Sequence, residues 1–241
     1  MKLIITLVSI AFSSIGYSQV NLPGMAINFG QGVDLVESLN ILGLFTVLSL
    51  APAILILCTC FTRIIVVLAF IRQAIGTQNM PPNQLLVGFA LFLTLFVMKP
   101  AGTAMYNNAL VPYMNKKISS PAALKVIETE LRGFMTKQVR KNDLQLFYDI
   151  TNEPLPRTID DVPTTYIIPS FIISELKTAF QIGFLLYLPF LILDMVIASV
   201  LMAMGMMMLP PVIVSFPFKL LLFVLVDGWY LVTGSIIRSF N

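Results

Sequence analysis

The chain has 241 residues, of which 57% are hydrophobic and 11% are charged, whereas an ordinary soluble domain carries about 25% charged residues. This composition is that of an integral membrane protein, and the formal net charge of +3 is too small to indicate a nucleic-acid partner. The absence of histidine removes most zinc sites, the Ser-His and Cys-His nucleophile systems and the commonest general base, so we expect neither a metal nor a cofactor.

The first eighteen residues, 1–18, have the three parts of a cleavable signal peptide. Lys2 is the positive start, residues 3–12 are the short apolar run, and Gly16-Tyr17-Ser18 is the small-x-small cleavage pattern. Such a run is too short for a bilayer span, which needs about 20 apolar residues. We expect cleavage after Ser18, which leaves the mature N-terminus outside the cytoplasm.

A polar lead over residues 19–40 precedes a predicted hydrophobic helical hairpin over residues 41–98. Its first apolar run, 41–71, is interrupted by Pro52 and contains Arg63, and its second run covers 85–98. Pro81 and Pro82 lie between the runs and cannot continue a helix. They are therefore predicted to form the hairpin turn.

Residues 99–169 hold most of the charged residues and are predicted to be a mainly helical aqueous segment. Ser120-Pro121 is a typical helix start, with an N-cap hydroxyl before a proline. A second short helix is expected after Asn142, presenting Leu144, Phe147 and Ile150. The stretch NEPLPRTIDDVP, with its three prolines, then returns as a loop towards the membrane.

The last part, residues 170–241, is predicted to be a second hydrophobic helical hairpin, turned at Pro210 and Pro211. Its apolar runs cover 171–209 and 212–237. If each hairpin crosses the membrane twice, the charged segment and the C-terminus both lie outside the cytoplasm. The predicted fold class is therefore all-α and membrane-associated, with two Pro-Pro-turned hairpins and an aqueous helical segment between them.

Charged residues interrupt these apolar runs, where each costs on the order of 2.5 to 3.5 kcal/mol at a bilayer centre. Such residues normally face protein or water, which favours helices buried in a larger assembly. Asp194 and Asp227 lie on neighbouring predicted helices, which also suggests an intramembrane aspartyl protease. The sequence Val226-Asp227-Gly228, however, is not the GxGD pattern of that class. We therefore favour pairing with a basic residue or a partner chain over catalysis, and we expect no enzyme. The charges are Arg63, Asp194, Lys219 and Asp227.

The segment LMAMGMMMLPP, residues 201–211, places five methionines within the seven positions from Met202 to Met208. Methionine is unbranched and polarizable, so such a cluster can fill irregular gaps in a core. Alternatively, copies of the segment around an axis can form a deformable seal that closes a pore and parts around a passing chain. Gly205 weakens helix and indicates a loop or a broken helix here.

Three long blocks of the chain have an unusual sequence. They are FTRIIVVLAFIRQAIGTQNMPPNQLLVGFALFLTLFVMKP (61–100), PSFIISELKTAFQIGFLLYLPFLILDMVIASVLMAMGMMMLPP (169–211) and FPFKLLLFVLVDGWYLVTGSIIRSF (216–240). These blocks resemble the FliP family of flagellar biosynthetic proteins. Virulence-type secretion homologues share this core. The signal peptide and the segment ELRGFMTKQVRKNDLQLF favour the flagellar branch.

The resemblance implies a structural subunit of the type III protein export gate in the bacterial inner membrane, at the flagellar basal body. In that family several copies of the chain, five by the resemblance, form a closed ring with the partner proteins FliQ and FliR. The bulk of the ring lies on the periplasmic side, and unfolded flagellar proteins pass through it. The resemblance also implies a methionine seal at rest, formed by Met206, Met207 and Met208 with Met204 and Gly205 beside them.

The resemblance further implies that six charges within the matched blocks hold subunits together. Glu175 and Lys177 are two positions apart and do not face each other on a helix, which favours partners on adjacent copies. The six are Arg63, Glu175, Lys177, Asp194, Lys219 and Asp227.

A multipass small-solute transporter is the alternative function. It needs a site near the bilayer midplane built from broken helices, for which Pro189 and Asp194 are candidates. The chain is short for that class, and a methionine cluster selects no solute chemically. A pore subunit for protein export therefore remains the leading hypothesis.

Overall fold

The computed structural model describes residues 21–22, 25–26, 35–77, 80–154, 156–206 and 208–240. The predicted signal peptide, most of the polar lead and Met207 lie outside these residues. The chain divides into two compact units, Met1–Ala53 and Ile54–Asn241. In the first unit, strands β1 (Asn21–Leu22) and β2 (Met25–Ala26) pair antiparallel. Apart from this pair, the regular elements of the described residues are helical, as the sequence predicts.

The first apolar run forms two helices, α2 (Leu35–Leu57) and α3 (Phe61–Ile75). The predicted interruption at Pro52 is wrong, because α2 continues through that position. The break lies instead at residues 58–60, where the Thr59 hydroxyl donates to the Ile56 carbonyl and accepts from the Phe61 backbone N–H. A threonine hydroxyl that bonds the backbone in this way competes with the helix and ends it.

The first hairpin consists of α3 and α4 (Asn83–Val97), with Pro81 and Pro82 in the turn between them. Helix α3 ends at Gly76, whose φ of 86° is a left-handed conformation that favours glycine. Apolar side chains of α3 recur at helical spacing and are almost fully buried. This buried face consists of Ile64, Val67, Leu68, Ile71, Ala74 and Ile75.

The second arm of this hairpin continues beyond the predicted end at residue 98. Helix α5 (Lys99–Met105), a π-helical turn η1 (Tyr106–Leu110) and α6 (Val111–Met114) follow α4, bent from it by 63°. Helix α7 (Ser120–Gln138) has Ser119 as its N-cap residue, so the start predicted at Ser120-Pro121 is correct to within one residue.

Helix α8 (Lys141–Thr151) is the predicted second short helix, but its buried face differs from the prediction. Leu144 and Tyr148 are buried one turn apart, whereas Ile150 is 66% exposed. The reason is that the Tyr148 ring stacks on the Tyr166 ring of the following long helix, with ring centroids 4.6 Å apart. Burial raises the pKa of the Tyr148 hydroxyl, which has no hydrogen-bond partner among the described residues.

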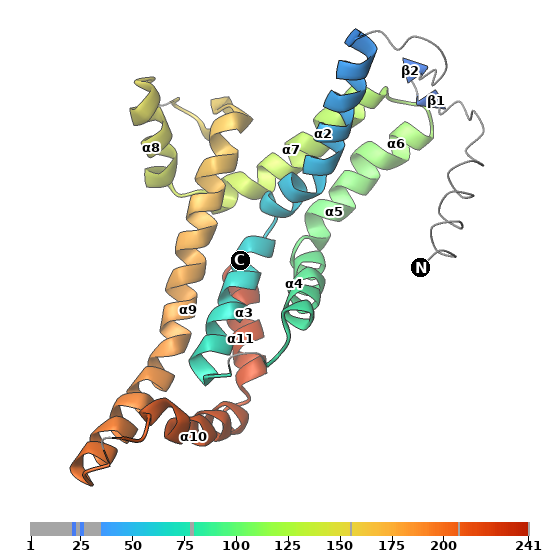
Figure 1. Cartoon of the computed structure of the whole chain (residues 1–241). Coiled ribbons are helices and arrows are strands. Elements are labelled where there is room, and N and C mark those ends of the chain that lie inside the picture. Colours follow the sequence, from blue (N-terminus) through green and yellow to red (C-terminus); the bar gives the residue numbers. More distant parts are fainter. Residues whose placement is uncertain are drawn as a thin grey trace, which may run out of the picture. The chain divides into compact units, whose positions relative to one another are not determined.

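Helix α9 (Thr164–Ala203) is a single 40-residue helix that contains Pro169 and Pro189. It starts before Pro169 and therefore crosses the predicted boundary between the aqueous segment and the second hairpin. A short 3₁₀ turn, η2 (Ile159–Asp161), precedes it. Helix α3 lies between α9 and α4 and packs against both of them (Figure 1).

The last two helices are α10 (Pro211–Leu225) and α11 (Gly228–Arg238), which are bent by 66° at a short break. Asp227 lies at this break with a φ of 51°. The second arm of the second hairpin is therefore broken, and α11 returns to pack against α3 and α9.

Among the described residues, α9 alone is long and apolar enough to cross a membrane by length and composition. Its most apolar 18-residue window has a mean hydropathy of 2.3, and only 11% of that window is buried within the chain. The bent pairs Asn83–Val97 with Lys99–Met114, and Pro211–Leu225 with Gly228–Arg238, raise the number of candidate spans to 3. Much of the apolar surface is therefore left uncovered by this chain.

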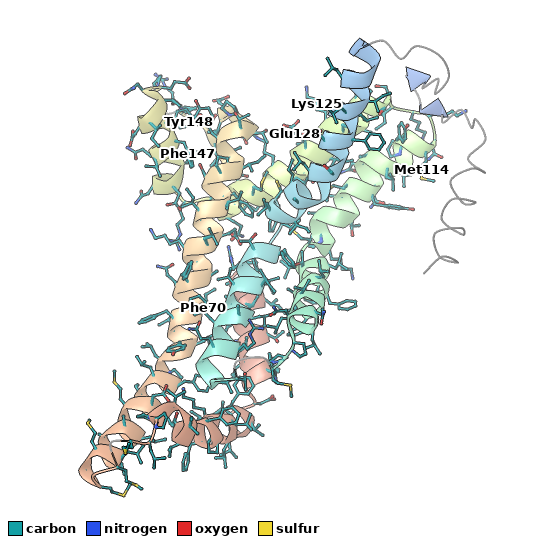
Figure 2. All side chains as sticks on the ribbon, in the orientation of Figure 1. Phe70, Met114, Lys125, Glu128, Phe147 and Tyr148 are labelled. Atoms are coloured by element: carbon teal, nitrogen blue, oxygen red, sulfur yellow. The ribbon has the colours of Figure 1, made fainter. Side chains whose placement is uncertain are left out.

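Gly183 allows the closest approach of α3 to α9, and its replacement gives a direct test of this packing. A Cβ atom at Gly183 would lie 2.7 Å from Cγ of Phe70, which points from α3 towards α9 (Figure 2). We expect Gly183→Ala to lower the thermal unfolding midpoint of the detergent-solubilised protein. Overpacking of this kind costs about 1 to 3 kcal/mol.

The matched control is Gly133→Ala in α7, where nothing lies within 4 Å of the added methyl group. Alanine is the better helix former, so this variant should be as stable as the unmodified protein or more stable by up to about 1 kcal/mol. Equal midpoints for the two variants would contradict the close packing of α3 on α9.

Candidate functional site

Arg63 of α3 forms a buried ion pair with Glu175 of α9. The Arg63 side chain is 2% exposed and that of Glu175 is 0% exposed. Arg63 Nε donates to Glu175 Oε2 at 2.9 Å, and Nη2 donates to Oε1. This two-point pairing uses the planar fork of the guanidinium, which a lysine does not possess.

The remaining donors of Arg63 reach two further parts of the chain. Nη1 donates to the Ser239 carbonyl at 2.7 Å and to the Ser239 hydroxyl at 3.0 Å, and Nη2 donates to Gln138 Oε1 at 2.9 Å. The Phe240 ring lies 3.8 Å from the guanidinium carbon. Arg63, Gln138, Glu175, Ser239 and Phe240 are called the Arg63 cluster below.

The Arg63 cluster joins segments that are far apart in the sequence. Arg63 lies near the start of α3, Gln138 ends α7, Glu175 lies in α9, and Ser239 follows α11. Gln138 also donates to the Phe240 carbonyl at 3.3 Å. Every part of the guanidinium thus has a partner, which is the condition under which a buried charge is tolerated.

A second cluster joins α9 to α10. Lys219 Nζ donates to Asp194 Oδ2 at 2.5 Å, and the Ser215 hydroxyl donates to Asp194 Oδ1. The side chain of Lys219 is 2% exposed and that of Asp194 is 21% exposed. Asp194, Ser215 and Lys219 are called the Asp194 cluster below.

The Asp194 cluster bears on the aspartyl protease hypothesis. Both oxygens of Asp194 are engaged by Lys219 and Ser215. Asp227 is exposed, and among the described residues it forms no hydrogen bond or ion pair with Asp194. The two carboxylates therefore do not form the facing pair on which that chemistry depends.

The structure brings together four of the six charges singled out in the sequence, as Arg63 with Glu175 and Lys219 with Asp194. Both pairs form within one chain. Lys177 and Asp227 are exposed, and neither side chain has a polar partner among the described residues. That the six charges hold subunits together stays a prediction.

The methionine segment forms the connection between α9 and α10. Helix α9 ends at Ala203, and Gly205 follows with a φ of 74°. The Met206 N–H donates to the Leu201 carbonyl and the Gly205 N–H to the Met202 carbonyl, each at 3.0 Å. This pair of bonds is a Schellman motif, which requires a left-handed residue and explains the glycine.

The methionine side chains of this segment are exposed rather than packed in the core of the chain. Met202 is 62% exposed, Met204 58%, Met206 42% and Met208 98%. Residues 202–208 are called the methionine loop below, and Met207 lies outside the described residues. These exposures disagree with a role as gap fillers within the chain, because a side chain that fills a core gap is buried.

The part of the chain that the structure describes contains no candidate metal site. Within it, no three or more His, Cys, Asp or Glu side chains gather as a metal-binding group. The two cysteines, Cys58 and Cys60, are buried and free. The chemistry of the site is thus that of paired charges and of an exposed, soft apolar loop.

Comparison with known proteins shows a family match over most of the chain. The family model described as FliP family matches residues 44–236. Flagellar biosynthetic protein FliP of Bacillus subtilis is 55% identical over 204 residues, which cover 85% of this chain and 92% of that protein. The protein of the same name from Aquifex aeolicus is 45% identical over 97% of this chain and 98% of its own length.

Replacement of Arg63 tests the importance of its cluster. We expect Arg63→Met to destabilise the folded chain by about 3 to 5 kcal/mol, because it leaves Glu175 buried without a partner. The double variant Arg63→Met/Glu175→Leu should recover part of this loss. Thermal unfolding in detergent measures both changes.

Arg157→Met serves as the control, because Arg157 is exposed and its side chain has no polar partner among the described residues. This control should leave the unfolding midpoint unchanged to within the effect of a typical surface substitution, about 0.5 kcal/mol. A destabilisation of about 3 to 5 kcal/mol in the control, or no destabilisation in Arg63→Met, would contradict the role assigned to the Arg63 cluster.

Proposed function

This chain belongs to the FliP family, and from that membership we propose that it is a structural subunit of the flagellar type III protein export gate. Several copies, five by the resemblance, surround a channel for unfolded flagellar proteins together with FliQ and FliR. The channel crosses the bacterial inner membrane at the flagellar basal body. The subunit is not an enzyme and requires no cofactor.

The observation that carries this proposal is the exposure of the methionine loop at the end of a 40-residue helix. Flexible apolar side chains left uncovered at a tight turn do not stabilise a single soluble chain. Loops of this kind from several copies around one axis cover each other and close the channel at rest. Because methionine adapts its shape, the closed loops can part around an exported chain of any sequence.

Uncovered apolar surface supports the assembly. Monomeric soluble proteins rarely expose large contiguous apolar patches, so this surface faces lipid, FliQ, FliR or other copies of the chain in our account. The bulk of the ring lies on the periplasmic side, as the resemblance implies. On α9 the exposed apolar residues are Phe180, Phe184, Leu185, Ile192, Met195, Val196 and Val200.

The charges divide into two groups in this account. Arg63 with Glu175, and Asp194 with Lys219, hold the elements of one subunit so that it can join the ring. Lys177 and Asp227 are exposed and bind neighbouring subunits in this account. Their exposure supports the assignment, because neither has a polar partner among the described residues and a charge buried in an interface needs one.

The transporter alternative receives no support at Pro189 and Asp194, the two residues on which it rests. That class builds its solute site from discontinuous helices, whereas α9 runs unbroken through Pro189. Asp194, the other candidate for a solute site, is occupied by Lys219 and Ser215. The export-gate proposal is therefore the better explanation of both residues.

Replacement of the methionines tests the seal. The variant with Met206, Met207 and Met208 all changed to Ala should assemble normally and let small ions leak through the purified complex in a planar bilayer. Alanine is too short to fill the centre of the ring, which leaves an open path for hydrated ions. An assembled complex of this variant that stays tight would remove the seal from the account.

The control changes Met80 and Met114 to Ala. Each of these methionines is 69% exposed and lies outside the second hairpin. The control complex should be as tight as the unmodified one. A leak of equal size in the control and in the triple variant would show that loss of methionine anywhere loosens the complex.

A further inference from the structure

The methionine loop has little structure of its own to fix its position. The backbone bonds that join it to α9 reach only the last turn of that helix, at Val200, Leu201 and Met202. Its described methionine side chains are 42% to 98% exposed. The place of the loop is therefore set by the two helices that it connects, α9 and α10.

The Asp194 cluster is the polar contact between these helices. Ser215 and Lys219 lie one turn apart on the same face of α10, and each bonds a different oxygen of Asp194 on α9. Ser215 is 0% exposed and Lys219 2% exposed, so both donors are shielded from water, while Asp194 is 21% exposed. Two directional bonds to one carboxylate fix how far α9 can slide along α10.

An aromatic contact between α9 and α10 agrees with the alignment that the Asp194 cluster sets. Phe190 and Phe223, one turn further from the loop on each helix, have ring centroids 6.4 Å apart. Asp194 pairs with Lys219 in the same antiparallel order. From Asp194 to the end of α9 at Ala203 the helix rises by about 14 Å, so the cluster lies within a short, stiff distance of the loop.

We infer that Asp194, Ser215 and Lys219 position the methionine loop, so that this buried cluster sets whether the seal is closed at rest. The inference rests on the proposed function. A soft seal closes a channel only when every copy presents its loop at the same depth. Apolar side chains alone allow α9 and α10 to slip, whereas the charge-assisted bonds hold a single register.

The experiment measures ion leakage through the complete gate complex, purified from its host and placed in a planar bilayer. The variants are Asp194→Asn, Lys219→Met and the charge exchange Asp194→Lys/Lys219→Asp, with complex mass recorded for each. Loss of a charge-assisted hydrogen bond should shift the balance between tight and leaking loops by about tenfold or more. The charge exchange restores the pair and should bring leakage back towards that of the unmodified complex.

Asp149→Asn in α8 and Lys125→Gln in α7 are the matched controls, because both residues are exposed and lie outside the second hairpin. They should leave leakage unchanged. The complex mass separates positioning from a loss of assembly, because only a leak through a complex of full mass reports a displaced loop. Rescue by the charge exchange then shows that the ion pair between positions 194 and 219 is the cause.

The triple methionine variant separates failure of this inference from failure of the proposed function. If the triple variant leaks and both single charge variants stay tight, the inference is overturned and the seal stands. If the assembled triple variant is itself tight, the methionine seal is contradicted, and the positioning role of the Asp194 cluster is contradicted with it.

Ser215→Ala covers the case in which the charge variants do not assemble. This variant removes one hydrogen bond to Asp194 and leaves the ion pair in place. An assembled Ser215→Ala complex should leak more than the unmodified complex and less than the triple methionine variant. An assembled Ser215→Ala complex that is fully tight overturns the inference.

Discussion

The buried guanidinium of Arg63 is the interaction on which the rest of the structure depends. Removing an arginine from water is expensive, and the chain offsets this by supplying a carboxylate, an amide oxygen, a hydroxyl and a backbone carbonyl at one point. These groups come from α7, α9 and the end of the chain. The guanidinium therefore sets where each of these elements must lie relative to α3.

The remaining features build outward from this centre. The apolar face of α3 covers α9 and α4, and the glycine at position 183 lets the Phe70 ring approach. Further along α9 the Asp194 cluster holds α10, and beyond it the methionine loop is left exposed. Helix α9 thus connects the Arg63 cluster, through Glu175, to the methionine loop at its C-terminal end. Membership of the FliP family gives this arrangement its context in flagellar export.

Features with a local cause were predictable from the sequence, and features with a distant cause were not. The start of α7, the proline turns and the loop at Gly205 depend on a few neighbouring residues. The break at Thr59 is an exception, because its cause is local and the sequence analysis placed the interruption at Pro52 instead. The buried face of α8 depends on a contact that composition does not reveal, that of Tyr148 with Tyr166. The cost of burying Arg63 marked it as important, but its partners lie 75, 112 and 176 positions away.

The central claim is that several copies of this chain form one gate with small hydrophobic partners, and a native mass measurement tests it most directly. The complex is solubilised in mild detergent from its own host, and each component is identified. Our account predicts one large defined particle that holds several copies of this chain and two small hydrophobic proteins. A monomer or dimer without partners would contradict it.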